Sequence, residues 1–193
     1  MKLFTLPKRK GGNNMLYVSD IYTTRPDNFK NKLQKVVYKT LEELSIHYER
    51  VETDEAITME DCTEIDKKLK MKMVKTLFLC NRQKTDFYLF ITCGNKRFDA
   101  KKFGSELGIS RVSFADEILM QEMLGTKIGS ATIFSSLLDN DNKVRIIIDI
   151  EVLKQDYYGC SDGTTTGYMK IKTNDIVDKV LPFSHHKETI LEM

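Results

Sequence analysis

Apolar residues recur every three or four positions between Phe29 and Leu44, which is the period of an amphipathic helix. Asp27 directly follows Pro26, and its side chain can accept hydrogen bonds from the first turn of a helix. The pattern therefore predicts a helix that begins at Asp27. A short helix is predicted after the capping sequence that starts at Thr58. Further helices are predicted over residues 100–107 and 114–124, and from 173 to near 182.

Strand patterns lie between these helices. Residues 46–52 alternate between apolar and polar side chains, and short apolar runs bounded by polar turns predict strands over 75–80, 87–93 and 144–150. The runs 75–80 and 87–93 are separated only by a polar turn, which is typical of an antiparallel hairpin. Two short strands, 157–160 and 168–172, flank a turn rich in Gly, Ser and Thr.

Together these elements predict an α+β fold with a single domain and a mostly antiparallel sheet flanked by helices. The loose, polar start of the chain predicts an N-terminal extension over residues 1–27, followed by the domain over 28–193. With 193 residues and 41% hydrophobic residues, the chain is long enough for one buried core.

Composition narrows the location and the class of the protein. No apolar run approaches the about 18 residues that a membrane span needs, and the basic N-terminus lacks the apolar stretch of a signal peptide. A cytoplasmic protein with no membrane partner is therefore expected. The net charge of +2 does not by itself indicate nucleic-acid binding, but lysines are concentrated in one segment. These lysines are Lys67, Lys68, Lys70, Lys72 and Lys75.

Several kinds of chemistry lack their usual residues. The four cysteines form no CxxC pair and two of the three histidines are adjacent near the C-terminus, so neither a metal site nor any other cofactor is expected. No phosphate-binding glycine motif is present, which removes the usual support for nucleotide hydrolysis and hydride transfer. The histidines are interpreted as structural or surface residues.

Two features remain as candidates for chemistry, and each has a structural alternative. Lys75 stands at the start of a predicted strand, where it is either an edge residue that discourages strand pairing or a cation for an anionic substrate. The segment 129–132 is either a simple turn or a source of backbone amides for an oxyanion. Lys68, Lys70 and Lys72 are either a solvated face or a surface that attracts a polyanion.

The order of these motifs resembles the YbaK/prolyl-tRNA synthetase-associated editing domain superfamily, and in particular its free-standing ProX/PrdX branch. The resemblance runs in order from Asn28 to Pro182 and includes a Lys-Thr-Leu sequence that starts at Lys75. The segments that carry it are 41–44, 48–51, 58–62, 75–79, 107–115, 125–130 and 144–149. It implies a barrel-like sheet with an active cleft at one end, and hydrolysis of the ester in mischarged aminoacyl-tRNA.

The resemblance also implies roles for individual residues. The family's lysine corresponds to Lys75, and its glycine loop begins at Gly129. The expected catalytic residues are Lys75, Gly129, Ser130 and Ala131. The expected substrate-binding residues are Met59, Cys62, Thr76, Thr132, Ser161 and Thr165. The expected tRNA-binding residues are Lys67, Lys68, Lys70 and Lys72.

The chain departs from the family pattern in its amino-acid pocket. Ile133 replaces the proline of the glycine loop, and Ser161 stands where the family has a pocket histidine. Thr165 and Thr76 each replace an asparagine. The retained lysine and glycine favour an aminoacyl-tRNA deacylase acting in trans, with alanyl-tRNA(Pro) as the expected substrate. Its expected partners are tRNA and, as a second candidate, prolyl-tRNA synthetase.

A different class of protein is also compatible with this sequence. The replaced histidine favours a non-catalytic or regulatory family member that binds aminoacyl-tRNA, whereas the retained Lys75 and Gly129 count against it. A purely structural protein would leave the lysine unexplained.

Overall fold

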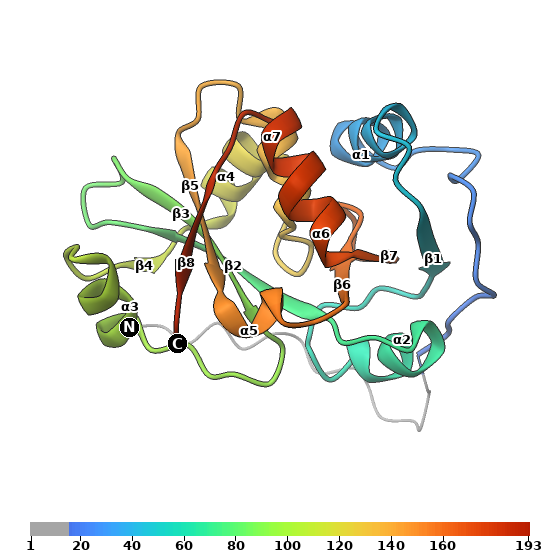
Figure 1. Cartoon of the computed structure of the whole chain (residues 1–193), viewed down its shortest axis with the longest axis horizontal. Coiled ribbons are helices and arrows are strands. Elements are labelled where there is room, and N and C mark those ends of the chain that lie inside the picture. Colours follow the sequence, from blue (N-terminus) through green and yellow to red (C-terminus); the bar gives the residue numbers. More distant parts are fainter. Residues whose placement is uncertain (1–15) are drawn as a thin grey trace.

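The computed structural model describes residues 16–193, which form one mixed domain with two sheets and flanking helices (Figure 1). The larger sheet has the strand order β4-β2-β3-β5-β8 and the smaller one has the order β1-β7-β6. The strands are β1 (Tyr48–Glu52), β2 (Val74–Cys80), β3 (Phe87–Cys93), β4 (Ser113–Phe114), β5 (Val144–Asp149), β6 (Tyr157–Ser161), β7 (Gly167–Lys172) and β8 (Glu188–Leu191). The predicted α+β domain is thus confirmed.

The pairing of the strands is antiparallel except on one side of the larger sheet. The pairs β3–β5 and β5–β8 are parallel, and β8 at the C-terminus was not predicted. Its short, mixed sequence, Glu-Thr-Ile-Leu, carries only a weak strand pattern. Within the described chain the two sheets are joined by a single parallel bridge between Met73 and Gly159, so the expected barrel-like sheet is not a closed barrel.

The helices are α1 (Lys32–Glu43), α2 (Cys62–Leu69), α3 (Ala100–Leu107), α4 (Glu117–Leu119), α5 (Ile150–Leu153), α6 (Thr173–Asp175) and α7 (Leu181–Phe183). Helical stretches with π or 3₁₀ hydrogen bonding are η1 (Met120–Leu124), η2 (Ile133–Leu138) and η3 (Ile176–Val180). All five predicted helical segments are present, and α3 has the predicted ends, but η2 and α5 were not predicted. The expected start of the first helix at Asp27 is wrong, because the Asn31 side chain accepts from the Gln34 amide and caps α1 there.

One other helix start also differs from expectation. Residues 113–114 form β4 instead of the first turn of a helix, because they pair with Leu79 and Cys80 of β2. The helix therefore begins only at Glu117. The capping sequence before α2 is instead confirmed, because the Thr58 hydroxyl accepts from the Asp61 amide and the Asp61 carboxylate accepts from the Thr58 amide, and α2 follows from Cys62.

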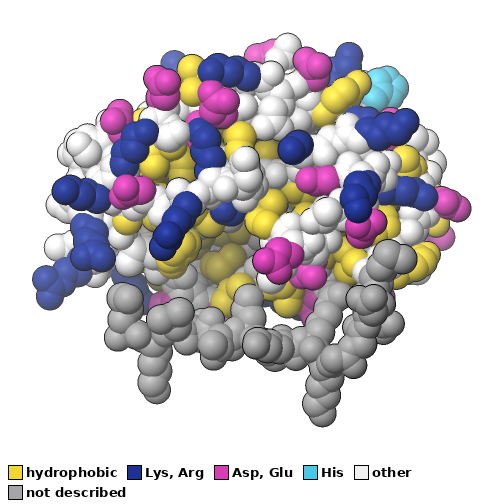
Figure 2. Space-filling view, turned by 90° about the horizontal axis from the view of Figure 1, so that it is seen from below, with side chains coloured by type: hydrophobic (Ala, Val, Ile, Leu, Met, Phe, Trp, Pro, Cys, Tyr) yellow, Lys and Arg dark blue, Asp and Glu magenta, His cyan; other side chains and the backbone are white. Residues whose placement is uncertain are grey.

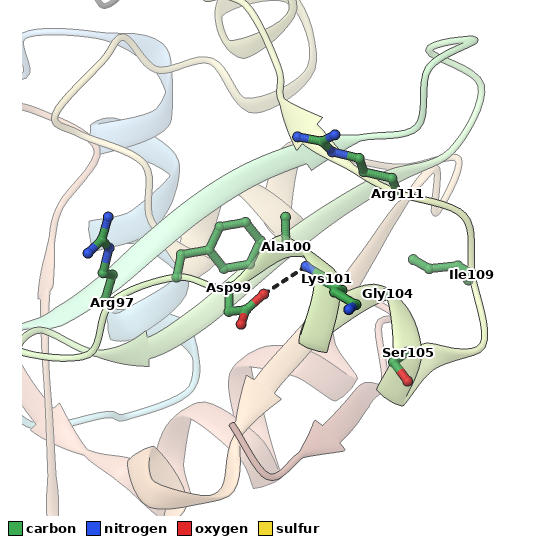
Figure 3. A pocket seen from close by; sticks show the side chains of 9 residues that line it. Arg97, Asp99, Ala100, Lys101, Gly104, Ser105, Ile109 and Arg111 are labelled. Atoms are coloured by element: carbon green, nitrogen blue, oxygen red, sulfur yellow. Dashed lines mark hydrogen bonds between the residues drawn. The ribbon is translucent and has the colours of Figure 1, made fainter.

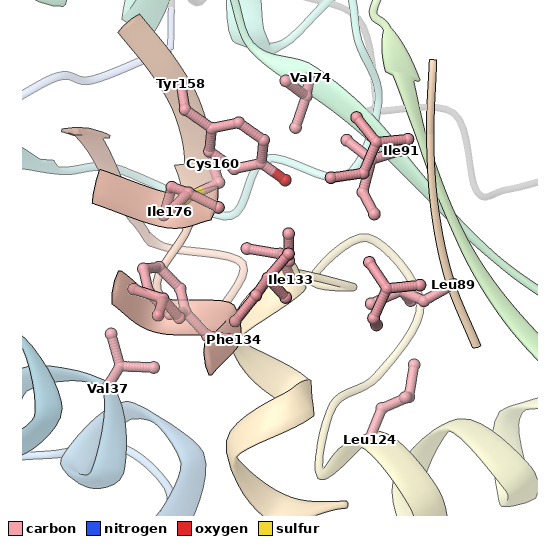
Figure 4. Packing of buried hydrophobic residues seen from close by; sticks show 14 of the residues in the cluster. Val37, Val74, Leu89, Ile91, Leu124, Ile133, Phe134, Tyr158, Cys160 and Ile176 are labelled. Atoms are coloured by element: carbon pink, nitrogen blue, oxygen red, sulfur yellow. The ribbon is translucent and has the colours of Figure 1, made fainter. Parts of the chain in front are cut away.

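Alternate residues of β2 face two different cores. Phe78 packs in the central core beneath α1, whereas Leu77 and Leu79 pack on the opposite face with Phe103 of α3. Figure 4 shows the central core, in which Tyr158 of β6 turns toward Val74 of β2. This alternation places the two faces of β2 in different chemical surroundings.

The predicted boundary between residues 27 and 28 stays a prediction, and residues 1–15 lie outside the described residues. The described part of the predicted extension runs beside β1, where Val18 pairs with Thr53 and Tyr22 pairs with Arg50. No helix among the described residues combines the length and apolar character needed to cross a bilayer.

Candidate active site

A cleft of about 950 Å³ opens along one edge of β2. One side of this strand pairs with β3 over its whole length, but on the other side only Leu79 and Cys80 pair with a strand, β4. The segment 74–78 is therefore left as an edge that the cleft borders. The remaining walls come from residues 56–62, 114–120 and 128–131, and from β6 and β7.

Lys75 lies at the border of this cleft. It is paired in register with Thr92 of β3, on the face of β2 opposite Thr76. Its ammonium donates to the backbone carbonyl of Lys96, and partial burial lowers the pKa of Lys75 below its ordinary value. Both residues line the cleft, but their side chains point to opposite faces of β2; we call the Lys75 side the rim of the cleft and the Thr76 side its floor.

The glycine loop forms the opposite wall. Gly129 has a φ of 89°, and a Cβ at this position would lie 2.9 Å from Cγ2 of Ile57, so both the backbone angle and the contact require glycine. Ser130 does not line the cleft, because its amide and hydroxyl both donate to the carbonyl of Lys127. The amides of Gly129 and Ala131 donate to no group within the described chain, and both residues line the cleft.

Met59 and Cys62 line the cleft as the resemblance implies. The hydroxyl of Tyr168 donates to the carbonyl of Ala56 at 2.6 Å, which holds the segment that carries Met59 against β7. Burial, reinforced by the carboxylates of Asp66 and Asp61, raises the pKa of the Cys62 thiol to about 12. This thiol is neutral at physiological pH and is a wall of the cleft, not a nucleophile.

Of the other predicted substrate-binding residues, some line the cleft and some do not. Ser161 lines the cleft, but its hydroxyl donates to the Thr164 carbonyl at 2.6 Å and accepts from the Gly163 amide at 3.0 Å. Thr165 lies outside the cleft lining, and its hydroxyl donates to Glu55. Thr132 is fully buried behind the glycine loop and also lies outside the lining.

The predicted tRNA-binding lysines lie on or just after α2 and do not line the cleft. Lys67 pairs with Glu64 at 2.6 Å, and Lys68 pairs with Asp20 at 3.3 Å. Lys70 ends the helix in a left-handed conformation, and Lys72 is exposed in the connection to β2. Two of these four lysines, Lys67 and Lys68, are thus neutralised by carboxylates.

Sequence reasoning missed several cleft residues that come from other segments. Met73, Met120 and Tyr168 supply apolar surface, and Phe114 lies at the mouth with 63% of its surface exposed. Phe114 was expected to begin a helix, and an apolar residue at a helix start carries no signal for such a position. Among residues 16–193 no histidine lines the cleft, and His186 is instead paired with Asp139 elsewhere.

The residues of the cleft are not arranged as a metal site. Among the described residues no group of three or more His, Cys, Asp or Glu side chains is placed to hold a metal ion. The cleft offers a rim cation, two unoccupied amides and apolar walls. This set can bind a small ester beside a phosphate and stabilise negative charge on its carbonyl oxygen.

Comparison with known proteins agrees with this chemistry. A sequence model of the aminoacyl-tRNA editing domain matches residues 53–179, which is more than half of the chain. Prolyl-tRNA editing protein ProX of Acetoanaerobium sticklandii is 29% identical over 116 residues, 60% of this chain and 71% of that protein. Prolyl-tRNA synthetase associated domain-containing protein 1 of Mus musculus is 29% identical over 126 residues, 64% of this chain and 74% of that protein.

A solved structure shares the fold. A crystal structure provisionally described as a trans-editing enzyme for prolyl tRNA synthetase superposes with a TM-score of 0.62 at 16% identity, over 86% of this chain and 99% of that chain. The predicted resemblance to the editing-domain superfamily is confirmed by these matches. The predicted enzyme class, an aminoacyl-tRNA deacylase, is confirmed with it.

Proposed function

Because the chain belongs to the aminoacyl-tRNA editing domain family, we propose that it hydrolyses the ester of mischarged tRNA in trans, with alanyl-tRNA(Pro) as its substrate. One observation carries this proposal. A single cleft brings together Lys75, Gly129 and Ala131 with Met59 and Cys62, although these residues come from three separate segments of the chain. The reaction would take place in the cytoplasm, where charged tRNA is used.

In the proposed reaction a water molecule adds to the carbonyl carbon of the ester. The amides of Gly129 and Ala131 donate to the oxygen that becomes negative, and loss of one such donor typically costs on the order of 2.7–4 kcal/mol. The bond between the carbonyl carbon and the ribose oxygen then breaks. The ribose oxygen leaves with a proton relayed through the neighbouring ribose hydroxyl of the substrate.

We propose that the Lys75 ammonium binds the phosphate of the terminal adenosine. This ammonium lies at the rim on the face of β2 opposite Thr76, so it is separated from the floor where the amino-acid side chain would lie. A lysine whose pKa is lowered by burial is still a suitable electrostatic clamp while it is protonated. No side chain of the cleft is needed as a base, because an aminoacyl ester is already activated by its α-ammonium group.

The apolar walls account for the proposed selectivity. A synthetase site built for proline rejects a smaller amino acid weakly, since each missing methylene is worth only about 1–3 kcal/mol. A second cavity that admits small side chains and excludes proline corrects the error. Met59, Cys62 and Met73 are proposed to set that size limit. Prolyl-tRNA synthetase is the proposed partner, because this editing acts on the tRNA that the synthetase charges.

The test is a deacylation assay on alanyl-, seryl-, threonyl- and prolyl-tRNA with the wild type and Lys75→Met. We expect fastest hydrolysis of alanyl-tRNA(Pro), none of prolyl-tRNA, and no effect of a chelator. The second candidate function is a non-catalytic reader of aminoacyl-tRNA, which the engaged Ser161 hydroxyl and the absence of a histidine from the cleft lining favour. Binding of alanyl-tRNA without hydrolysis would establish that alternative.

A further inference from the structure

A second hollow, of about 900 Å³, lies on the α3 side of the larger sheet. We call it the basic hollow, and the residues that define it here are Arg97, Phe98, Asp99, Lys101 and Arg111. Figure 3 shows Arg97 and Arg111 on opposite sides of this hollow, with the first residues of α3 between them. Figure 2 shows Lys and Arg side chains along the same end of the molecule, where Figure 1 places α3 and β4.

The cations of the basic hollow are not balanced by carboxylates. Arg97, Lys101 and Arg111 are exposed, and none of them forms an ion pair with another described residue. The carboxylate in the hollow, Asp99, accepts from the amides of Lys101 and Lys102 and so caps α3. Lys67 and Lys68 on α2 are both paired with carboxylates, so the basic hollow is the better site for an added anion.

The basic hollow begins where the cleft ends. Phe98 lines the basic hollow, Phe114 lines the cleft, and their ring centroids are 5.8 Å apart. Lys75 of the cleft donates to the carbonyl of Lys96, whose neighbour Arg97 lines the basic hollow. A single extended ligand can therefore occupy both.

The boundary between the two carries an exposed aromatic ring. Phe114 keeps 63% of its surface exposed although it packs edge-on against Phe98. An exposed aromatic beside unpaired arginines is the arrangement that binds single-stranded nucleic acid, in which bases stack on rings and cations follow the phosphates. A duplex does not offer unstacked bases, and a protein ligand gives no reason for unpaired arginines on both sides of the hollow.

We propose that the basic hollow binds the single-stranded 3′ end of the tRNA. Arg97 and Arg111 contact phosphates of the nucleotides that precede the terminal adenosine, and Phe114 stacks on a base at the entrance to the cleft. The inference rests on the proposed function, since the aminoacyl group must lie in the cleft for the strand to leave across Phe114. This proposal places the tRNA-binding surface on the α3 side of the sheet and not at the lysines on and after α2, where the sequence predicted it.

The first test measures binding and requires no catalysis. A fluorescent acceptor-stem hairpin with a single-stranded 3′ end is titrated with the wild type and with the double variant Arg97→Gln/Arg111→Gln. We expect about tenfold weaker binding and a salt dependence flatter by about 1.4 in log–log slope, since each phosphate contact of a single strand contributes about 0.7. A hairpin that lacks the single-stranded end should bind both proteins equally weakly.

The matched control is Lys35→Gln/Lys39→Gln on the exposed face of α1, which removes the same charge at the far end of the molecule (Figure 1). It should bind like the wild type. Equal weakening by both double variants would show that only the total charge matters and would overturn the proposal. Unchanged affinity in Arg97→Gln/Arg111→Gln would also overturn it, as would larger losses in Lys67→Gln/Lys68→Gln.

The second test separates docking from chemistry. Hydrolysis is compared for alanyl-tRNA and for alanyl-adenosine, which has the ester but no phosphate. Arg97→Gln/Arg111→Gln should raise KM for alanyl-tRNA about tenfold and leave kcat/KM for alanyl-adenosine unchanged, whereas equal losses on both substrates would overturn the proposal. If the wild type hydrolyses neither substrate but still binds the hairpin through the two arginines, the proposed function fails and the docking surface stands.

Discussion

The cleft and the basic hollow adjoin where Phe114 packs against Phe98, but their linings differ in polarity and charge. The cleft is walled by apolar side chains and by a thiol whose raised pKa keeps it neutral, and the hydroxyl of Ser161 is engaged in its own turn. The basic hollow is open to solvent and is bordered by the unpaired guanidinium groups of Arg97 and Arg111. We therefore expect the cleft to select its ligand by shape and the basic hollow to bind its ligand by charge.

The position of Lys75 between them follows from the two faces of a single strand. Successive side chains of β2 point to opposite faces, so Thr76 and Phe78 border the cleft floor while Lys75 and Leu77 point toward α3. A small apolar amino acid can be selected only in a dry cavity of limited size. A nucleic-acid strand is bound most readily on an exposed cationic surface. Lys75 lies between the two sites, because it lines the cleft and bonds to Lys96, the neighbour of Arg97 in the basic hollow.

The largest expected effect on activity comes from removing the cation of Lys75. Lys75→Met keeps the aliphatic stem and deletes the charge, so kcat/KM for alanyl-tRNA should fall about 10²–10³-fold with little change in melting temperature. Lys75→Arg keeps a cation and should retain part of the rate. A rate for Lys75→Met close to that of the wild type would return Lys75 to its structural interpretation as an edge residue.

The glycine loop should give the next largest effect. Gly129→Ala adds a Cβ that would lie 2.9 Å from Ile57 at a φ of 89°, so the loop must move and its amides with it. We expect a 10–100-fold loss of kcat/KM, roughly that of a misplaced catalytic group, and a loss of stability of about 1–2 kcal/mol. Unfolding and turnover are measured on the same preparation.

Gly108→Ala is the matched control for this substitution. Gly108 has a φ of 63°, but nothing lies within 4 Å of an added Cβ. It should show the cost in stability without the loss of activity. If both alanine variants lose activity equally, backbone strain in general, and not the position of the Gly129 loop, controls the reaction.

A smaller effect tests the size limit of the cleft. Cys62→Ala enlarges the cavity next to Met59, so the ratio of prolyl- to alanyl-tRNA hydrolysis should rise by about tenfold, the equivalent of one methylene. Hydrolysis of alanyl-tRNA should persist, because a thiol with a pKa of about 12 supplies almost no thiolate at pH 7. Complete loss of hydrolysis would instead assign Cys62 a chemical role.

Local sequence patterns predicted the elements of this fold better than their contacts. The run 87–93 became β3 at the predicted residues, because a short apolar run between polar turns has few other solutions. The cap of α1 was misplaced by four residues, since Asp27 and Asn31 are equally good caps in isolation. Strand β8 depends on pairing with β5, a contact that no local pattern encodes.

The same limit applies to the candidate site. Lys75, Gly129, Met59 and Cys62 could be identified because each stands in a motif of the resembling family, and the structure places all four on one cleft. The proposed roles of Phe114 and the basic hollow could not be predicted, since they depend on the contact between Phe98 and Phe114, which lie sixteen positions apart in the sequence. Whether a lysine is free or paired with a carboxylate is likewise a tertiary property.

The smallest expected effect concerns Ser161, which stands where the family has a pocket histidine. Its hydroxyl bridges the Thr164 carbonyl and the Gly163 amide, so it is not available to a substrate hydroxyl. Ser161→Ala should lower stability by about 1–3 kcal/mol, because two buried backbone groups lose their partner. It should change the preference between alanyl- and seryl-tRNA by less than about threefold, since a site that does not bond the substrate hydroxyl cannot discriminate by it. Exposed Ser110→Ala is the control for both readouts. A shift in preference of tenfold or more would mean that the turn opens to bind the substrate, and would extend recognition in the cleft from shape to hydrogen bonding.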